Sequence, residues 1–347
     1  MLSSEQLKKI TVSGRAFERG FQYGNLLKNE INTFLSSNLA HINLVRNIPI
    51  NYTQAIKFIK PYIKIIEEDL PEIAEEIMGL SRGANISYTE AMLLQLRREI
   101  IGYELECTSL GYLDKCKNTY IAQNIDLAGD LARLGIVYRI EAKQPNGTSI
   151  LQYSHVGLLG YMGINSHGIG IGINMVLSVG WKPGVPIYLL IRHLLTKSTI
   201  EDCLLEISRI RRASSRSILL TDGNKMLNIE MTVDTHRIIE HSLLLHTNHY
   251  LHEDYIHIDR IPTNSSSYYR MEYMKNFMSD ICHKPNIKSI KNLLSSHFDN
   301  KSSICVHNEN NLKAAKTIAS VIMNINNKSL LIANGYPCQN SYHEYKF

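Results

Sequence analysis

Glu106-Cys107-Thr108-Ser109 lies where the hydrophobic pattern of the chain changes. The residues before it mostly show the spacing of helices, and those after it form short strand-like segments such as 120–126. If the chain cut itself between Glu106 and Cys107, this cysteine would become an N-terminal residue. Its freed α-amine, with a pKa of about 8, could then act as the base for its own thiol. The stretch therefore predicts both a structural boundary and a candidate nucleophile.

Residues 1–106 carry the helical pattern. The isoleucines of segment 55–67 recur at helical spacing, although Pro61 predicts a kink, and segment 70–80 is similar. Ser87-Tyr-Thr-Glu90 has the form of a capping box, which predicts a helix that continues to about residue 101.

From residue 107 the period of the pattern changes to two. Segments 136–142 and 149–154 flank Asn146-Gly147, a strong hairpin signal. The other expected elements are strands over 162–166, 168–174, 217–220, 226–232, 237–239, 243–246, 315–325 and 329–333, and helices over 186–196, 199–211, 268–281 and 287–296. This order favours an α+β fold in which two sheets pack face to face with helices outside.

Composition narrows the class of protein. With 44% hydrophobic and 20% charged residues, the chain can bury a core, and its net charge of +5 is spread among acids. We therefore expect no nucleic-acid partner, whereas an anionic small substrate is compatible. The polar residues 1–9 do not resemble a signal peptide, and apolar runs such as 187–191 are too short to span a membrane. Six cysteines without a CxxC pair predict reduced thiols in a cytoplasmic protein.

Seven short segments follow one another along nearly the whole chain: Arg19-Gly20-Phe21-Gln22-Tyr23-Gly24, Glu76 to Gly83, Cys107-Thr108-Ser109, Gln123-Asn124-Ile125-Asp126, Gly163 to Gly168 with Asn174, Thr247-Asn248-His249, and Gly335-Tyr-Pro-Cys338. In this order they resemble the signatures of the acyl-coenzyme A:6-aminopenicillanic acid acyltransferase family, peptidase family C45. Each motif alone is weak, and their succession is specific.

The resemblance implies a four-layer αββα sandwich of the N-terminal-nucleophile (Ntn) hydrolases, with an N-terminal helical segment. It also implies autoproteolysis into an α chain, 1–106, and a β chain, 107–347, that form one composite domain. Asp126 lies nineteen residues after Cys107, as in related Ntn enzymes. Two departures stand out. Gln123 replaces the Arg of bile-salt hydrolases, which argues against such substrates, and Glu106 stands where the family commonly has Gly.

The resemblance assigns roles to individual residues. Cys107 would be the nucleophile and Asp126 would hold the new α-amine; read alone, the two are a buried small side chain and a turn cap. Asn248 would donate its amide N–H to the oxyanion, with Asn174 or the backbone N–H of Met175 as a second donor.

Two further residues belong to the expected site. Gln123 is placed with the oxyanion and substrate-binding groups. Arg270, after a Ser-rich stretch, would orient the Asp or the α-amine region through its planar guanidinium, although a solvated arginine at a helix start is the competing interpretation.

Three other patterns could indicate a zinc site, a dinucleotide-binding loop or a papain-like protease, and all three are rejected. We therefore expect neither a metal nor a cofactor. His246, His249, His252 and His257 lie close together but lack the spacing of usual zinc sites. The glycines of 168–172 echo a dinucleotide loop, yet no helix follows them. The local signature of papain-like proteases is absent around the cysteine.

The leading hypothesis is a self-processing amide hydrolase or N-acyltransferase that works through an acyl-thioester on Cys107. Its substrate would be a small acyl amide or acyl-coenzyme A, and a peptide-like secondary metabolite is favoured by family analogy alone. The alternative is an uncleaved, non-enzymatic binding protein of the same fold. A homo-oligomer is compatible with either hypothesis.

Overall fold

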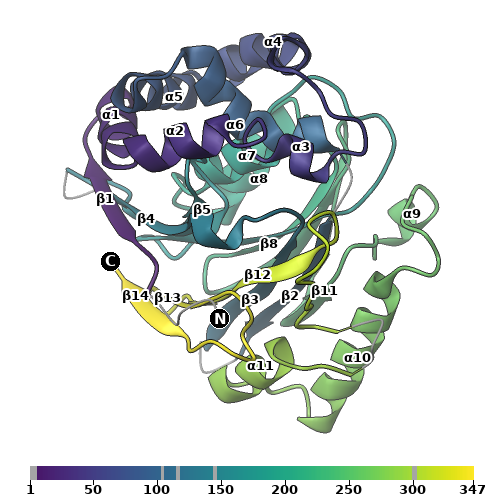
Figure 1. The fold of residues 1–347 in the computed structure, drawn as a ribbon. Helices are drawn as coiled ribbons and strands as arrows, with labels where there is room; N and C mark the ends of the chain where they lie inside the picture. Colours follow the sequence, from purple (N-terminus) through teal and green to yellow (C-terminus); the bar gives the residue numbers. More distant parts are fainter. Residues whose placement is uncertain (1–5, 103–104, 115–117, 144–146, 299–302) are drawn as a thin grey trace.

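The computed structural model describes residues 6–102, 105–114, 118–143, 147–298 and 303–347, and two stacked β-sheets form its centre (Figure 1). Among these residues the larger sheet has eight strands, in the order β1 (Lys9–Ser13), β4 (Gly135–Glu141), β5 (Ile150–His155), β6 (Met162–Asn165), β7 (Gly170–Asn174), β8 (Arg216–Thr221), β9 (Met226–Met231) and β10 (His236–Glu240). The smaller has six, in the order β11 (Leu243–His246), β2 (Leu105–Leu113), β3 (Thr119–Leu127), β12 (Lys316–Asn324), β13 (Ser329–Asn334) and β14 (His343–Lys346).

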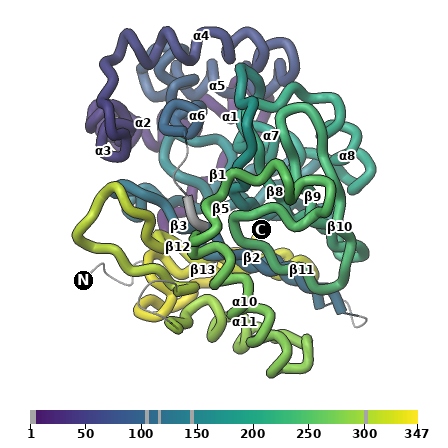
Figure 2. Tube along the Cα trace, turned by 90° about the vertical axis from the view of Figure 1, so that its right-hand side faces the viewer, coloured from purple at the N-terminus to yellow at the C-terminus, as the bar shows by residue number. Residues whose placement is uncertain are grey.

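Helices cover the outer face of each sheet (Figures 1 and 2). Over the larger sheet lie α1 (Ala16–Leu26), α2 (Lys28–Ser36), α3 (Ile42–Val45), α4 (Tyr52–Asp69), α5 (Pro71–Ala84), α6 (Tyr88–Ile101), α7 (Ile187–Leu194) and α8 (Ile200–Arg209). Below the smaller sheet lie α10 (Ser266–Asp280) and α11 (Ile287–Leu294), with the short α9 (Glu253–Ile256) to one side. The predicted α+β arrangement of four layers is therefore confirmed.

Most predicted elements of the strand-rich part lie where the sequence placed them. The capping box at Ser87 and Glu90 starts α6. The strands on either side of Asn146-Gly147 pair with each other as β4 and β5, while Asn146 itself lies outside the described residues. The closing hairpin is present as β12 and β13.

Residues 1–106 are less purely helical than expected. Segment Lys9–Ser13 is a strand in which Ile10 and Val12 are buried, and it pairs in parallel with β4. Five residues of alternating burial were too short to stand out beside a hundred residues of helical pattern. The backbone N–H of Leu7 donates to the hydroxyl of Tyr345 at 2.8 Å, which ties this strand to β14. The N-terminal part of the chain thus contributes strand β1 to the larger sheet.

Helices α1 and α5 cross with their backbones in close contact. Gly20 and Gly24 on α1 face the main chain of α5, and Gly79 and Gly83 on α5 face the main chain of α1. A Cβ at Gly20 would lie 1.8 Å from the carbonyl oxygen of Glu76 on α5. A Cβ at Gly24 would lie 2.2 Å from the carbonyl oxygen of Leu80, one turn further along α5. Only glycine fits at such distances. The first two motifs of the sequence are therefore the two halves of one helix crossing.

A buried carboxylate joins this crossing to the larger sheet. Glu76 on α5 accepts hydrogen bonds from Arg192 on α7 at 2.7 Å, Arg19 on α1 at 3.2 Å and the hydroxyl of Tyr138 on β4 at 3.1 Å. Because Glu76 and Arg192 are almost fully excluded from water, losing one partner would leave an unpaired buried charge.

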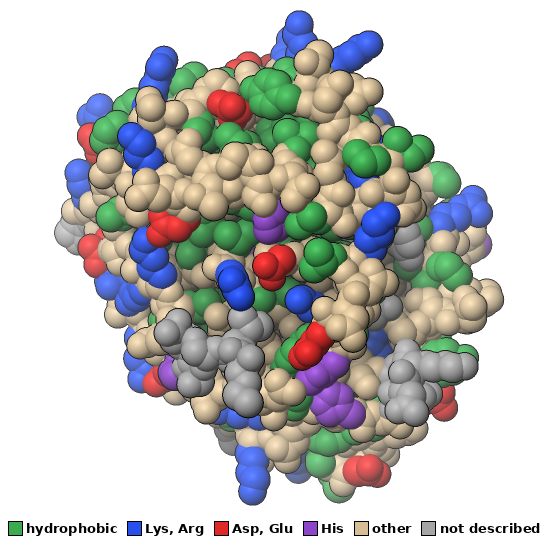
Figure 3. Space-filling view, viewed as in Figure 1, with side chains coloured by type: hydrophobic (Ala, Val, Ile, Leu, Met, Phe, Trp, Pro, Cys, Tyr) green, Lys and Arg blue, Asp and Glu red, His purple; other side chains and the backbone are tan. Residues whose placement is uncertain are grey.

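Lys and Arg side chains lie scattered over the face seen in Figure 3, with Asp and Glu among them. Every helix in the described part of the chain is too short or too polar to cross a membrane.

Replacing Gly24 by Ala should destabilise the protein by about 2 kcal/mol, because overpacking typically costs ~1–3 kcal/mol and exceeds the helix-propensity gain of ~1 kcal/mol. Thermal unfolding of Gly24→Ala and of Asn25→Ala, an exposed position on the same helix, would measure this. A Gly24→Ala variant as stable as Asn25→Ala would contradict the close crossing.

Candidate active site

Cys107 lies near the start of β2, opposite Ile125 on β3. Side chains alternate across a strand, so neighbours of Cys107 in the chain face different layers. Ser109 contacts Asn174 of the larger sheet, whereas Thr108 contacts Arg270 of α10. The Cys107 side chain, only 3% exposed, therefore faces the space between the two sheets.

Two buried side chains hold the backbone of Cys107. Its N–H donates to Oδ1 of Asn248 at 2.9 Å, and its carbonyl oxygen accepts from Nη1 of Arg270 at 2.7 Å. Asn248 follows β11, and Arg270 lies in the second turn of α10. The Thr-Asn-His motif and the arginine after the Ser-rich stretch are thus brought to the candidate nucleophile.

Arg270 is fully buried and links three segments of the chain. Besides the Cys107 carbonyl, it donates to Oγ1 of Thr108 and Oδ1 of Asn248, each at 2.8 Å. These partners are neutral oxygens, so the guanidinium places a positive charge close to Cys107. Arg270 therefore lies beside the backbone of Cys107, and a role toward Asp126 or a freed α-amine stays a prediction.

The orientation of Asn248 differs from the sequence-based expectation. Its Oδ1 faces two donors, the Cys107 N–H and Arg270, and its Nδ2 donates to the carbonyl of Met175 at 3.1 Å. Because arginine has no acceptor, the atom beside it must be oxygen. In this state Asn248 is an acceptor at Cys107, and a role as oxyanion donor would require its amide to turn.

Asn174 and Met175 support the same loop. Nδ2 of Asn174 donates to the carbonyl of Thr247 at 2.9 Å, and its Oδ1 accepts from the hydroxyl of Ser109. Met175 contributes its carbonyl oxygen to Asn248. In the geometry seen here both residues support the Asn248 loop, Asn174 through the Thr247 carbonyl and Met175 through Asn248 itself.

The sulfur of Cys107 lies in a mixed environment. Burial, followed by the charge of Asp126, raises the pKa of the thiol to about 12, while the backbone N–H of Asp126, the charge of Arg270 and the side chain of Gln123 act in the opposite direction. Gln123 is itself held by Ile173, whose N–H donates to its Oε1 at 3.0 Å and whose carbonyl accepts from its Nε2. The thiol is therefore protonated at neutral pH, with donors already beside the sulfur.

Asp126 is fixed from the side of β12. Its Oδ1 accepts from the hydroxyl of Thr317 at 2.6 Å, and its backbone pairs with Glu106 across β2 and β3. The expected cleavage point between Glu106 and Cys107 thus lies within paired strands. The side chain of Glu106 is outside the part of the structure that is described.

A small cavity of about 30 Å³ lies among α2, α6, α7 and the segment after β5. Tyr161, Tyr188 and Arg98 are among its lining residues. Burial raises the pKa of both tyrosines, and a thiolate at Cys107 would raise it further, so the cavity is electrostatically close to the sulfur. These residues could not be found from the sequence, because they are scattered aromatic and basic positions without a motif.

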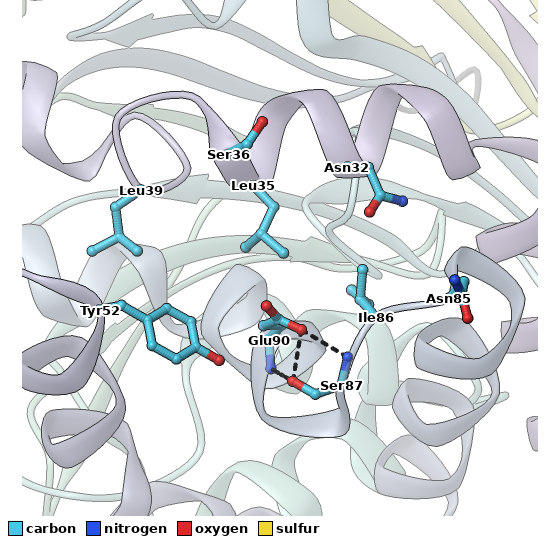
Figure 4. A pocket seen from close by; sticks show the side chains of 9 residues that line it. All are labelled: Asn32, Leu35, Ser36, Leu39, Tyr52, Asn85, Ile86, Ser87 and Glu90. Carbon is cyan, nitrogen blue, oxygen red and sulfur yellow. Dashed lines mark hydrogen bonds between the residues drawn. The ribbon is translucent and has the colours of Figure 1, made fainter.

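The polar side chains of one larger cleft and two of the rejected histidines are engaged in structural contacts. A cleft of about 550 Å³ between α2, α4 and α6 contains Glu90, whose carboxylate is engaged with Ser87 in the helix cap (Figure 4). Of the rejected histidines, His246 pairs with the buried Glu230 at 3.0 Å, and His249 stacks on Tyr268.

The comparison with protein families agrees with the motif order. A profile of the acyl-coenzyme A:6-aminopenicillanic acid acyl-transferase family matches residues 114–338, well over half of the chain. The chain belongs to this family. Membership supports a role in acyl transfer or amide hydrolysis. The matched span begins after Cys107, so the Cys-Thr-Ser motif lies outside it.

Similar proteins carry related names. The "Acyl-coenzyme A:6-aminopenicillanic-acid-acyltransferase 40 kDa form" of Emericella nidulans is 22% identical over 367 residues, covering 94% of this chain and 99% of the relative. Penicillin V acylase from Agrobacterium tumefaciens is a similar solved structure, with 14% identity, a TM-score of 0.44, and coverage of 66% of this chain and 83% of the other. A mutant conjugated bile acid hydrolase from Clostridium perfringens gives 10% identity, a TM-score of 0.44, and coverage of 70% and 97%.

The raised pKa predicts slow alkylation of Cys107 in the continuous chain. At about pH 7.5 a thiol with a pKa near 12 has roughly a thousandfold less thiolate than an unperturbed one. Iodoacetamide should label the exposed Cys282 first, and Cys107 about as slowly as Cys203, whose pKa burial also raises to about 12. Peptide mapping over time gives the three rates, and labelling of Cys107 as fast as Cys282 would contradict this environment.

Proposed function

We propose that this protein is a self-processing cysteine enzyme of the Ntn type, in which Cys107 first cleaves its own peptide bond and then carries an acyl group as a thioester. The observation that supports this most directly is the convergence on one residue. Asn248 and Arg270 hold the backbone of Cys107, while Gln123 and the Asp126 N–H face its sulfur. Any buried backbone needs partners, but a cysteine buried only for packing needs no polar groups at its sulfur.

The processing step uses the backbone that these residues hold. Sγ of Cys107 attacks the carbonyl carbon of Glu106, the C–N bond between them breaks, and the thiol proton passes to the departing nitrogen. Water then hydrolyses the Glu106 thioester and leaves a carboxylate on Glu106 and a free thiol on Cys107. Oδ1 of Asn248, which accepts the Cys107 N–H in the continuous chain, remains as an acceptor for the new α-amine.

The acyl-transfer step uses the freed amine as base. The amine takes the thiol proton, the thiolate attacks the substrate acyl carbon, and the leaving amine or coenzyme A thiol receives that proton. Water or a bound amine then attacks the acyl-thioester, so the outcome is amide hydrolysis or N-acylation. Asp126 and Gln123 keep the amine and sulfur aligned. Asn248 keeps its Oδ1 toward the amine, so the backbone N–H of Met175 is the oxyanion donor that we assign.

The positive charge of Arg270 keeps the α-amine competent as a base. Arg270 and the Cys107 nitrogen share the same acceptor, Oδ1 of Asn248. A positive charge this close disfavours protonation of the amine and lowers its pKa from an ordinary value of about 8. Compared with a protein that lacks this charge, a larger share of the amine is then able to accept the thiol proton.

The substrate class follows from the relative and from the cavity. The Emericella nidulans relative is named for an acyl-coenzyme A and an amine, 6-aminopenicillanic acid. At about 30 Å³ the cavity beside Tyr161 and Tyr188 has room for only one or two water-sized groups, so in this state it could take no more than the end of a small acyl group. We assign a small acyl amide or acyl-coenzyme A as donor, and a peptide-like secondary metabolite as the class of acceptor or product.

Intact mass should reveal two fragments of about 12 and 27 kDa from the 39.5 kDa chain, with Cys107 at the new N-terminus. Cys107→Ala should remain uncut, because the nucleophile is gone, and Cys282→Ala, altered at an exposed thiol, should be cut like the wild type. A wild-type chain that stays whole after prolonged incubation would sink the proposal and favour the uncleaved binding protein.

The charge of Arg270 predicts a shift in pH dependence. With a short-chain p-nitrophenyl ester as probe, kcat/KM should rise with pH as the α-amine loses its proton. Arg270→Met should move this rise to higher pH by about one unit, because removing a nearby positive charge raises the amine pKa. Arg270→Lys should be slower yet keep the wild-type midpoint, and equal midpoints in all three proteins would refute the electrostatic role.

A further inference from the structure

Two histidines and two cysteines outside the candidate active site come together beside β12. His297 follows α11, Cys305 and His307 precede β12, and Cys338 follows β13. Each contributes one ligand atom, and these atoms all lie within 4.8 Å of one another. Three separate segments of the chain are thus joined at one point.

The distances among three of the four ligand atoms are close to those between ligands of one tetrahedral ion, and His297 completes the set within 4.8 Å. The sulfurs of Cys305 and Cys338 are 3.6 Å apart, Nε2 of His307 is 3.1 Å from the Cys338 sulfur, and it is 3.6 Å from that of Cys305. Zinc with Zn–S of about 2.3 Å and Zn–N of about 2.0–2.1 Å places its ligands roughly 3.4–3.8 Å apart. A disulfide would bring the sulfurs to about 2.05 Å.

The chemistry of the set also fits a divalent cation. Two thiolates and two neutral imidazoles balance the charge of Zn²⁺, and the thiol protons go to solvent on binding. Cys305 is buried, while the other three are exposed, so an ion can enter from outside.

We propose that His297, Cys305, His307 and Cys338 bind one structural Zn²⁺ ion. All four positions are filled by protein, as in closed structural sites and unlike catalytic ones. This site is separate from the His246–His257 group that the sequence analysis rejected. The expectation of no metal rested on spacing, and a set spread over three segments gives no spacing signal.

The ion would brace the segment behind Asp126. Between Cys305 and His307, the N–H of Val306 donates to Oγ1 of Thr317 at 2.8 Å, and the Val306 carbonyl accepts from the Thr317 N–H at 2.9 Å. The Thr317 hydroxyl in turn donates to Asp126. Cys305 and His307 therefore flank Val306, which holds Thr317, and Thr317 holds Asp126. The four ligands act as positioning residues for Asp126.

Metal content tests the site directly. The untagged full-length protein, purified without chelator and exchanged against stoichiometric Zn²⁺, should retain about one zinc per chain by elemental analysis. Cys338→Ser, at an exposed position, and His307→Ala should each lower this at least tenfold, while Cys282→Ser should retain the ion. Less than a tenth of an equivalent in the wild type would overturn the proposal.

Cobalt gives a second readout that does not depend on activity. Co²⁺ added to metal-free protein should produce the visible absorption of a tetrahedral cobalt–thiolate centre, which is lost in Cys338→Ser and kept in Cys282→Ser. Zinc should also raise the melting temperature of the wild type and leave that of Cys338→Ser unchanged. A non-reduced mass lower by two hydrogens, with a Cys305–Cys338 cross-link, would instead identify a disulfide and contradict the zinc site. These outcomes are independent of whether the chain cleaves itself.

Discussion

The geometry around Cys107 depends on the hydrogen bonds that the buried guanidinium of Arg270 donates. The guanidinium joins the carbonyl of Cys107, Thr108 on the same strand and Asn248 on a distant loop. Since arginine can only donate, it fixes the oxygen of Asn248 toward Cys107 and so provides the acceptor for the Cys107 N–H. One buried cation thus sets the orientation of the loop and the hydrogen bonding of the backbone, and it opposes the rise in the thiol pKa that burial and Asp126 cause.

The way residues 1–106 are held explains how a cut chain could remain one molecule. Strand β1 pairs with β4, helices α1 and α5 cross at their glycines, and Glu76 links this crossing to Arg192 and Tyr138 beyond residue 107. These contacts are noncovalent, buried and spread over the larger sheet. Cleavage before Cys107 would therefore release a strand end without releasing the helical layer.

The sequence predicted much of this arrangement because its motifs coincide with physical requirements. The paired glycines mark backbone contact, and Cys107, Asn248 and Arg270 meet as the motif order indicated. What it could not predict depends on three-dimensional neighbours. Strand β1 is recognised by its pairing with β4, which its five residues alone do not reveal. The Asn248 amide is oriented by Arg270, 22 residues away. The cluster of His297, Cys305, His307 and Cys338 is assembled from three segments.

Asp126 connects the candidate nucleophile to the four-residue cluster. Its charge raises the pKa of the Cys107 thiol, and its Oδ1 accepts a hydrogen bond from Thr317, which is bonded to Val306 between two of the cluster residues. The central claim remains that Cys107 carries the acyl group. Acid quenching of the protein during turnover of a short-chain p-nitrophenyl ester, followed by peptide mass analysis, tests it most directly. We expect one acyl group on the peptide that starts at Cys107, released by hydroxylamine. Turnover with the acyl group on another residue, or with none trapped on Cys107, would contradict it.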